Sequence, residues 1–470
     1  MSGLSAAFLL KNAGFDVTVL EGSPRLGGKI AVSEVGGVAV DAGAEALLAR
    51  RPEGIGLIDE LGLSGQLEVP GTTSAGIWTR GSIRPLPRRQ FMGVPADIGE
   101  LAGTGILSEA GLTRAAQEPG LPAAALAADV SVTGVVGGRF GPELVDRLVE
   151  PLLGGVYAGR CDDLSFRATL PALADAAQGH SSLTEAAASL VPAPTGSGAR
   201  PDRAQQSDPA RRPRPVFTTL AGGLGTLPEA LAAASGAVVR TGAMVRGLAR
   251  TTAGWRLTVG SAHAPEAVDA DAVIIAVPAI PASRLLAGVA DPAAAALGEI
   301  RYASMAIVTL AYPVTAFPQA VTGSGFLVPA VDGRTIKAVT FSTVKWPHLL
   351  ATRPGLHIVR CSVGRLGEDA VLQRDDAELA ALAAADLADA TGVRGRPADV
   401  RVSRWGGGLP QYSVGHLDRV ARIRAGIAAQ PGLAICGAAY DGVGIPACIG
   451  TAKLAVEQVL AYLDGHGKPA

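Results

Sequence analysis

The N-terminal segment of the chain places an acidic residue at the end of a short apolar stretch. Residues 15–21 (FDVTVLE) predict a buried strand that ends at Glu21. An amphipathic helix over residues 3–13 precedes this strand, and Gly14 occupies the helix C-cap position. In a nucleotide-binding β–α–β unit, an acid at this place accepts hydrogen bonds from ribose hydroxyls and repels a 2′-phosphate. The segment therefore predicts binding of a dinucleotide whose adenosine carries no 2′-phosphate.

The phosphate-binding loop expected before this helix is only partly present. A complete unit has a strand, the pattern G-x-G-x-x-G and then the helix, with the acid about 20 residues further on. Here Gly3 corresponds to the last glycine alone, and Glu21 follows it. We expect the first strand and the other two glycines to be missing from the chain as given. A start codon assigned too far downstream would explain the gap.

A second glycine motif follows directly after Glu21. It spans residues 25–29 (RLGGK). Gly27 and Gly28 allow backbone N–H groups to face a pyrophosphate, and Arg25 is placed to orient the same region. Adjacent glycines also occur in ordinary turns, so the motif is indicative because of its position after Glu21.

Further glycine-rich segments lie near expected helices and strands. Residues 220–228 (LAGGLGTLP) precede a helix, and residues 242–245 (GAMV) follow a short strand. Val245 is placed to bring backbone groups to an adenine edge, although ordinary β-structure explains the segment equally well. Residues 433–446 (LAICGAAYDGVGIP) predict a strand and a glycine-rich loop before a helix that starts at Thr451. The N-terminus of that helix would favour negative charge on a bound group.

Composition excludes several classes of protein. The net charge is −1 and aromatic residues make up 4% of the chain, which disfavours nucleic-acid binding. No run of 18 uncharged apolar residues predicts a membrane-spanning helix. The four cysteines lack C-x-x-C spacing and the six histidines lack H-x-x-x-H spacing. We therefore expect no disulfide framework and no metal site, and a cytoplasmic location.

The order of elements predicts an α/β fold of interleaved lobes. Strand–helix alternation occurs at both ends of the chain, and a strand-rich block covers about residues 300–365. Residues 191–215 are rich in Pro, Arg, Ala and Ser and predict a disordered loop. The predicted segments are a discontinuous nucleotide-binding domain (1–66, 216–280 and 415–470), a helical subdomain (85–190), the disordered loop (191–215) and a substrate-binding domain (281–414).

Taken together, these segments resemble the protoporphyrinogen and coproporphyrinogen III oxidases, FAD enzymes of the amine oxidase-like flavoprotein superfamily. The resemblance runs from Gly3 to about Leu463, apart from residues 191–215. The segments typical of these oxidases, rather than of the whole superfamily, are 149–159 (VEPLLGGVYAG), 163–165 (DLS), 409–416 (LPQYSVGH) and 440–449 (YDGVGIPACI).

The resemblance implies a Rossmann-type FAD-binding lobe with a truncated first strand, a mixed α+β substrate lobe and a helical subdomain. It implies FAD as the cofactor and singles out no catalytic residue. Together with the glycine motifs, it predicts these cofactor-binding residues: Gly3, Glu21, Arg25, Gly27, Gly28, Lys29, Gly43, Ala44, Glu45, Ala46, Val245, Gly437, Ala438, Val443, Gly444 and Ile445.

The function implied by the resemblance is the O₂-dependent oxidation of coproporphyrinogen III, or of protoporphyrinogen IX, with release of hydrogen peroxide in heme biosynthesis. An enzyme of the same pathway is a possible partner. Candidates for holding the substrate propionates are Arg80, Arg84, Arg88 and Arg89, with solvent-exposed surface charge as the alternative. Two other hypotheses are another FAD oxidoreductase, such as an amine oxidase or carotenoid desaturase, and a relative that has lost its flavin and its activity.

Overall fold

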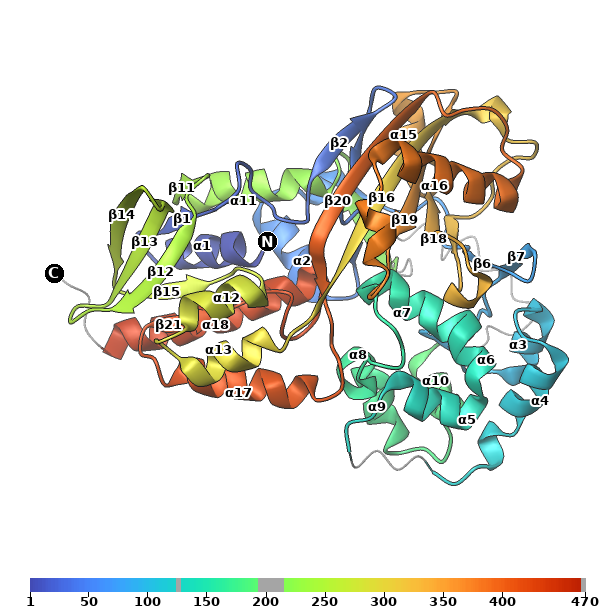
Figure 1. The fold of residues 1–470 in the computed structure, drawn as a ribbon, viewed down its shortest axis with the longest axis horizontal. Helices are drawn as coiled ribbons and strands as arrows, with labels where there is room; N and C mark the ends of the chain where they lie inside the picture. The colour runs from blue at the N-terminus through green and yellow to red at the C-terminus, as the bar shows by residue number, and fades with distance from the viewer. Residues whose placement is uncertain (124–127, 193–214, 466–470) are drawn as a thin grey trace, which may run out of the picture.

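The computed structural model describes residues 1–123, 128–192 and 215–465. The predicted disordered loop 191–215 lies outside these ranges apart from its ends. The described chain forms three regions: a nucleotide lobe on the left of Figure 1, a sheet lobe at the upper right and a helical lobe at the lower right. Among the described residues, no helix combines the length and apolarity needed to cross a bilayer.

The nucleotide lobe contains two separate pairs of parallel strands. In one, β1 (Thr18–Leu20) pairs with β11 (Val238–Arg240), and in the other, β15 (Val273–Ile275) pairs with β21 (Leu433–Ile435). Helix α1 (Ser2–Asn12) contributes to two apolar clusters and shares both of them with α18. The remaining elements of this lobe are α2 (Pro52–Glu60), β10 (Phe217–Leu220), α11 (Leu227–Ser235), the antiparallel strands β12 (Val245–Arg250), β13 (Trp255–Ser261) and β14 (Ala264–Ala270), α12 (Ala279–Leu286), α13 (Asp291–Gly298), α17 (His416–Ala428) and α18 (Ile445–Gly465).

Helix α18 begins earlier than the sequence predicts. The prediction placed its start at Thr451, whereas the helix starts at Ile445. Pro446 is compatible with this start because the first turn of a helix does not need the N–H group that proline lacks. Ile445 packs in the same apolar cluster as Leu4 and Phe8 of α1, which fixes the start of α18 against the first helix.

The predicted boundary between residues 280 and 281 falls inside α12. Helices α12 and α13 share an apolar cluster with Trp255, Ile275 and Leu433, which belong to strands of the nucleotide lobe. These two helices therefore pack with the nucleotide lobe, although the predicted substrate-binding domain begins at residue 281.

The sheet lobe is built on seven strands in the order β20-β16-β19-β18-β17-β6-β7. One face packs against α16 (Asp376–Thr391) through alternate residues such as Val308 and Cys361. Because successive side chains point to opposite faces, Arg360 and its cross-strand neighbours Thr309 and Thr340 lie on the other face. The strands are β6 (Gly76–Thr79), β7 (Ser82–Pro85), β16 (Tyr302–Pro313), β17 (Gly325–Leu327), β18 (Ile336–Phe341), β19 (Leu356–Val363) and β20 (Asp399–Pro410). Two short helices, α14 (Ser342–Lys345) and α15 (Pro347–Thr352), connect β18 to β19.

A hairpin of β2 (Val32–Val35) and β3 (Val38–Asp41) joins the two lobes. Val35, Val38 and Val40 share an apolar cluster with Ala311 and Ile358 of the sheet lobe. Short strands β4 (Leu47–Leu48) and β5 (Leu67–Glu68) pair with β10 on the nucleotide side.

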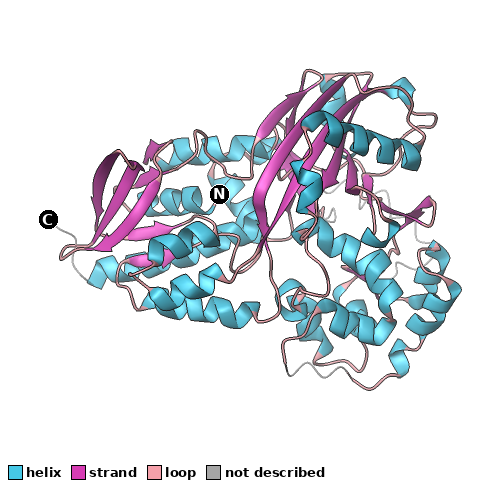
Figure 2. Ribbon diagram, in the orientation of Figure 1, coloured by secondary structure: helices cyan, strands magenta, loops and turns pink. Residues whose placement is uncertain are grey.

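The helical lobe confirms the predicted helical character of its segment and appears almost wholly cyan in Figure 2. It has a single apolar core that includes Leu101, Phe140, Leu148 and Leu173. Its helices are α3 (Ile98–Thr104), α4 (Glu109–Ala116), α5 (Gly138–Phe140), α6 (Pro142–Leu144), α7 (Glu150–Tyr157), α8 (Phe166–Thr169), α9 (Pro171–Ala177) and α10 (Leu183–Leu190).

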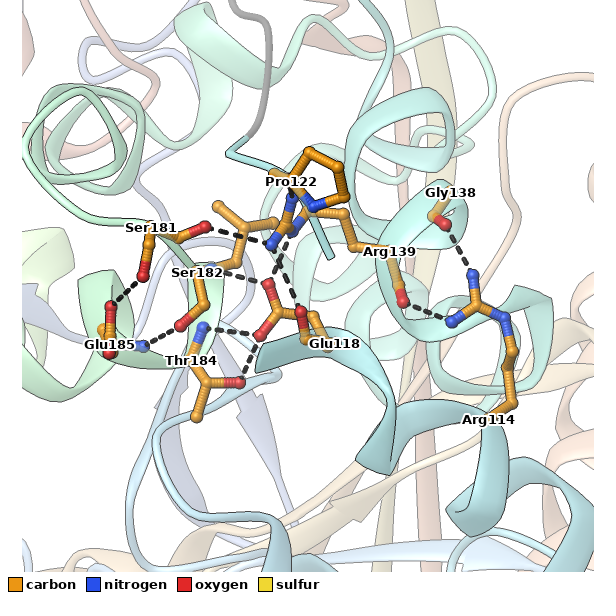
Figure 3. A network of polar contacts seen from close by, with 10 residues as sticks. Arg114, Glu118, Pro122, Gly138, Arg139, Ser181, Ser182, Thr184 and Glu185 are labelled. Carbon is orange, nitrogen blue, oxygen red and sulfur yellow. Dashed lines mark hydrogen bonds and ion pairs between the residues drawn. The ribbon is translucent and has the colours of Figure 1, made fainter. Parts of the chain in front are cut away.

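A buried ion pair ties the helical lobe together (Figure 3). The Arg139 Nε atom lies 2.5 Å from Glu118 Oε1, and Glu118 is completely buried. The same carboxylate accepts the backbone N–H of Leu183 at 2.7 Å and the hydroxyl of Thr184 at 2.8 Å, at the N-terminus of α10. Arg139 also donates to the carbonyl oxygens of Pro122 and Ser181. The pair therefore joins segments that lie far apart in the sequence, with its charged groups hydrogen-bonded.

We predict that Glu118→Ala lowers the free energy of unfolding by about 3–5 kcal/mol, because it leaves a buried guanidinium without its partner. The measurement is urea-induced unfolding followed by circular dichroism. The control is Asp269→Ala, which breaks an exposed pair with Arg256 and should cost no more than about 1 kcal/mol. Equal losses in the two variants would contradict the role assigned to the buried pair.

Candidate functional site

Glu21 lies where β1 ends, beside the segment that contains Val245. The backbone N–H of Ser23 donates to Glu21 Oε1 at 2.8 Å, and the backbone N–H of Ala243 donates to the Glu21 carbonyl at 2.8 Å. The structure thus brings together two segments predicted to contact adenosine, although they lie far apart in the sequence. Gly3 lies in the first turn of α1, with its Cα close to Ala276.

The loop of residues 25–30 is held by one of its own side chains. Arg25 donates to the carbonyl oxygens of Leu26, Gly28 and Ile30, so its guanidinium organises the loop. Gly27 has φ +95°, and a Cβ there would lie 2.6 Å from the Ile30 carbonyl oxygen, which makes glycine necessary. Gly28 also has a positive φ and is open on its Cα side. The glycine motif is therefore required by the backbone conformation.

Lys29 is a cation without a carboxylate partner among the described residues. Its Nζ atom lies 5.9 Å from the centre of the Tyr302 ring. Burial lowers the pKa of Lys29, because the ammonium group has lost much of its water. A partly buried cation near the positive N-terminal end of α1 is suited to an anionic group such as a pyrophosphate.

The loop Gly43–Ala46 is fixed by residues of the sheet lobe. Glu45 forms a buried ion pair with Lys345, at 2.6 Å, and a second one with Arg360. Burial alone would raise the pKa of Glu45, but the two cations outweigh it and lower this pKa to about 2. Arg360 also donates to the Gly43 carbonyl oxygen at 2.5 Å. Because the Glu45 carboxylate is engaged by Lys345 and Arg360, we expect the rest of this loop to contact a cofactor.

Asp41 holds the glycine-rich segment that precedes α11. Its carboxylate accepts the backbone N–H groups of Leu224, at 3.1 Å, and Gly225, at 3.0 Å. Burial raises the pKa of Asp41 to about 6, although these two hydrogen bonds favour the charged form. The carboxyl group therefore connects the end of β3 to the loop before α11.

The C-terminal glycine-rich loop is anchored by Tyr412. The Tyr412 hydroxyl donates to the Ala438 carbonyl at 2.9 Å and accepts the Gly442 backbone N–H at 2.6 Å. Burial and the neighbouring Tyr157 raise the pKa of Tyr412, so the hydroxyl stays protonated. Of the predicted contact residues here, Gly437 donates to Thr451 and Ile445 is buried in the core. Val443 and Gly444 directly precede Ile445, the first residue of α18.

His416 contacts both Tyr412 and the same loop. Its ring stacks on Tyr412 with centroids 3.8 Å apart, and its Nε2 atom lies 3.1 Å from the Tyr440 carbonyl oxygen. A carbonyl oxygen only accepts, so Nε2 carries the proton. Burial lowers the pKa of His416 to about 4, which keeps the ring neutral at physiological pH.

The two segments most typical of porphyrinogen oxidases meet in the structure. Gln411 donates to the Tyr157 carbonyl oxygen at 2.7 Å, and the Tyr157 and Tyr412 rings have centroids 5.4 Å apart. The Ser165 backbone N–H donates to the Tyr412 carbonyl oxygen at 2.8 Å. Residues 149–165 of the helical lobe therefore contact residues 409–416, next to the C-terminal glycine-rich loop.

Asp41, Lys345 and Arg360 were not among the site residues predicted from the sequence. Arg360 interrupts the apolar strand LHIVRCSV of residues 356–363. A charged residue inside an apolar strand is a signal that could have identified it, because such a residue needs a partner when buried. Lys337, in the strand IKAVTF, carries the same signal.

The four arginines proposed for the propionates differ in their surroundings. Arg80 lies 3.5 Å from Glu143, and Arg88 is exposed. The Nε atoms of Arg84 and Arg89 are buried and have no hydrogen-bond partner among the described residues. Arg84 and Arg89 are therefore the partly buried arginines of the four, and Arg89 Nη1 lies 4.0 Å from Asp97 Oδ2.

Comparisons with known proteins identify the family. The model of the flavin containing amine oxidoreductase family matches residues 1–460. The chain belongs to this family. It is 38% identical to coproporphyrinogen III oxidase of Mycobacterium tuberculosis H37Rv, covering 99% of this chain and 97% of that protein. It is 32% identical to coproporphyrinogen III oxidase of Bacillus subtilis, covering 98% and 97%. A solved structure of a putative protoporphyrinogen oxidase from Exiguobacterium sp. 255-15 is 31% identical, with a TM-score of 0.83 and coverage of 98% and 97%.

Membership of the family implies FAD as the cofactor, and the residues present fit it. The Glu21 carboxylate lies at a strand end, where a ribose would be held. Lys29, a cation with no carboxylate partner in the described part of the chain, would face the pyrophosphate. The individual contact residues stay predictions, and Gly43 offers a direct test of them.

We predict that Gly43→Ala reduces FAD affinity by about tenfold or more, because a Cβ at this position would lie 1.9 Å from the Lys29 carbonyl oxygen and force the loop to move. The measurement is the flavin-to-protein ratio and the dissociation constant for FAD. Gly56→Ala in α2 is the matched control, since a Cβ there meets nothing within 4 Å. An unchanged FAD affinity in Gly43→Ala would exclude this loop from the site.

We also predict that the buried Lys337 makes the free energy of unfolding depend on pH. Its Nζ lies 3.5 Å from the Gly154 carbonyl oxygen of α7. Burial, aided by Arg365, lowers its pKa from 10.5 to about 7. Between these two values the unfolded chain binds more protons than the folded one, so stability should rise with pH. Lys337→Met should remove this rise, which is at most about 1.4 kcal/mol per pH unit.

Urea-induced unfolding at pH 7, 8 and 9 measures the effect of Lys337→Met. The control is Lys453→Met, on the exposed face of α18, which should leave the pH dependence unchanged. If the free energy of unfolding changed with pH in the same way in the wild-type protein and in Lys337→Met, the Lys337 amine would not be desolvated as described.

Proposed function

We propose that this protein oxidises coproporphyrinogen III to coproporphyrin III in heme biosynthesis, with protoporphyrinogen IX as the alternative substrate. Bound FAD would accept hydride from the methylene bridges of the substrate. Three rounds remove six hydrogens, and three molecules of O₂ are reduced to hydrogen peroxide. Several relatives that match nearly the whole chain have the name coproporphyrinogen III oxidase, and one from Bos taurus, 29% identical, has the name protoporphyrinogen oxidase.

The contact between residues 149–165 and 409–416 is the observation that carries this proposal. Both segments are typical of porphyrinogen oxidases, and Tyr412 links them to the loop that contains Ala438. Val156 and Val414, one in each segment, expose 38% and 41% of their surface. Exposed apolar side chains beside a flavin-binding loop suit a large apolar macrocycle.

The chain's own residues would bind and orient the substrate rather than transfer protons through a strong acid–base pair. Aromatisation supplies the driving force, so positioning is the main requirement. Arg84 and Arg89 are partly buried, whereas Arg80 and Arg88 are exposed, and a guanidinium that is shielded from water forms strong paired hydrogen bonds with a carboxylate. We therefore assign the propionates to these two arginines rather than to Arg80 or Arg88.

Amine oxidation is the less favoured hypothesis. The solved structure of putrescine oxidase bound to putrescine shows 17% identity and a TM-score of 0.65, a likeness that shows the fold alone. We place the protein in the cytoplasm, where its four buried, free cysteines would stay reduced. An enzyme of the heme pathway stays a possible partner.

The test is a fluorescence assay under air with coproporphyrinogen III, protoporphyrinogen IX and putrescine. We expect porphyrin to form faster than by autoxidation, with one molecule of bound FAD per chain and about three of hydrogen peroxide per porphyrin. Arg89→Met should raise KM by about tenfold with little change in kcat, because it removes binding to a part of the substrate that does not react. Arg256→Met, at an exposed pair, is the control.

Two results would reject the proposal. The first is porphyrin formation no faster than autoxidation by protein that contains FAD. The second is turnover of the amine in place of both porphyrinogens.

A further inference from the structure

A small polar cavity lies between the nucleotide lobe and the sheet lobe, next to the loop Gly43–Ala46. Its volume is about 20 Å³. The lining side chains that matter here are Asp41, Glu45 and Thr219 of the nucleotide lobe and Ser342, Trp346 and Arg360 of the sheet lobe.

Unpaired polar atoms are concentrated around this cavity. Fourteen buried side-chain nitrogen or oxygen atoms lack a hydrogen-bond partner within the described part of the chain, and five of them belong to residues that line it. These five are Thr219 Oγ1, Ser342 Oγ, Trp346 Nε1, His348 Nδ1 and Arg360 Nε. The exposed fractions of Thr219, Ser342 and Trp346 are 2% or less, so bulk water does not reach them. Buried polar groups are paired in nearly all native proteins, so a concentration of unpaired atoms indicates a bound species.

The chemistry of the lining restricts what this species is. Trp346 Nε1–H and Arg360 Nε–H only donate, so the bound species must accept hydrogen bonds. The carboxylates of Asp41 and Glu45 disfavour an anion, and the guanidinium of Arg360 disfavours a cation. A cavity of this size accommodates one water molecule, for which roughly 10–15 Å³ is enough. A neutral molecule that both accepts and donates therefore fits best.

We propose that the cavity is a binding site for one ordered water molecule that joins the two lobes. The water accepts hydrogen bonds from Trp346 and Arg360 of the sheet lobe. It donates to the hydroxyl oxygen of Thr219 in the nucleotide lobe or to that of Ser342.

The water would complete the hydrogen bonding of Arg360. The two terminal nitrogens of this guanidinium already donate to Glu45 and to the Gly43 carbonyl oxygen, whereas its buried Nε–H has no partner among the described residues. A water on that atom supports the guanidinium from the cavity side. The site would exist whether or not the protein oxidises porphyrinogens, because none of the interactions depends on a substrate.

The experiment is a crystal structure of the full chain at about 1.5 Å resolution, with a parallel crystal soaked in sodium bromide. We expect one water in the cavity, with at least three protein partners, and no anomalous bromide signal. The double variant Thr219→Val/Ser342→Ala removes the two hydroxyl acceptors, one from each lobe, at nearly constant volume, and it should lose this water while Glu45 and Arg360 stay paired. Ser33→Ala is the control, since Ser33 Oγ is also buried and unpaired but lies outside the cavity; this variant should retain the water.

Three outcomes would overturn the proposal. They are an empty cavity in the wild-type protein, a bromide ion in the water position, and an unchanged water in the double variant. If the double variant does not fold, the wild-type and bromide-soaked crystals decide the question by themselves.

Discussion

The buried carboxylate of Glu45, held between Lys345 and Arg360, determines how the nucleotide lobe meets the sheet lobe. Both cations come from the sheet lobe, and Arg360 also binds the carbonyl oxygen of Gly43. Removing either side would leave buried charge without a partner, which is far more costly than breaking an exposed pair. The loop Gly43–Ala46 belongs to the nucleotide lobe, but residues of the sheet lobe therefore determine its position. A cofactor bound to this loop would be aligned with the sheet lobe by the same contacts.

The C-terminal glycine-rich loop is also held by elements outside the β–α–β core. Tyr412 follows β20 of the sheet lobe, and its hydroxyl binds both Ala438 and Gly442. Its ring contacts Tyr157 of the helical lobe. The two loops predicted to contact the flavin are thus each fixed by residues from outside the β–α–β core, and the helical lobe supports the second loop through Tyr157. This arrangement explains why the chain passes repeatedly between lobes, since each passage brings in a residue that positions part of the site.

Local features of the fold could be predicted from the sequence, whereas partners distant in the sequence could not. The helix before Glu21 was predicted from apolar spacing, and Gly14 and Gly27 have the positive φ expected of glycine at such positions. The strand, predicted as buried over residues 15–21, covers only Thr18–Leu20 and is partly exposed. Glu45 was predicted as a cofactor contact, but its side chain binds Arg360, 315 residues away. Nothing in the local pattern reveals that pairing, and the Glu118–Arg139 pair escaped prediction for the same reason. The start of α18 was placed late because Pro446 looked like part of the loop.

The carboxyl groups of Glu45 and Asp41, near the contact between the nucleotide and sheet lobes, have different pKa values because their partners differ. Burial disfavours the charged form of both, yet the pKa of Glu45 falls to about 2 and that of Asp41 rises to about 6. Glu45 faces an ammonium and a guanidinium group, whereas Asp41 is bound by two backbone N–H groups. The negative charge on Glu45 further disfavours the charged form of Asp41. A full positive charge at contact distance outweighs desolvation, and two amide dipoles do not. The loop Gly43–Ala46 is consequently held by an interaction that keeps its charge throughout the physiological range. The segment before α11 is held instead by Asp41, whose pKa of about 6 lies close to the physiological range.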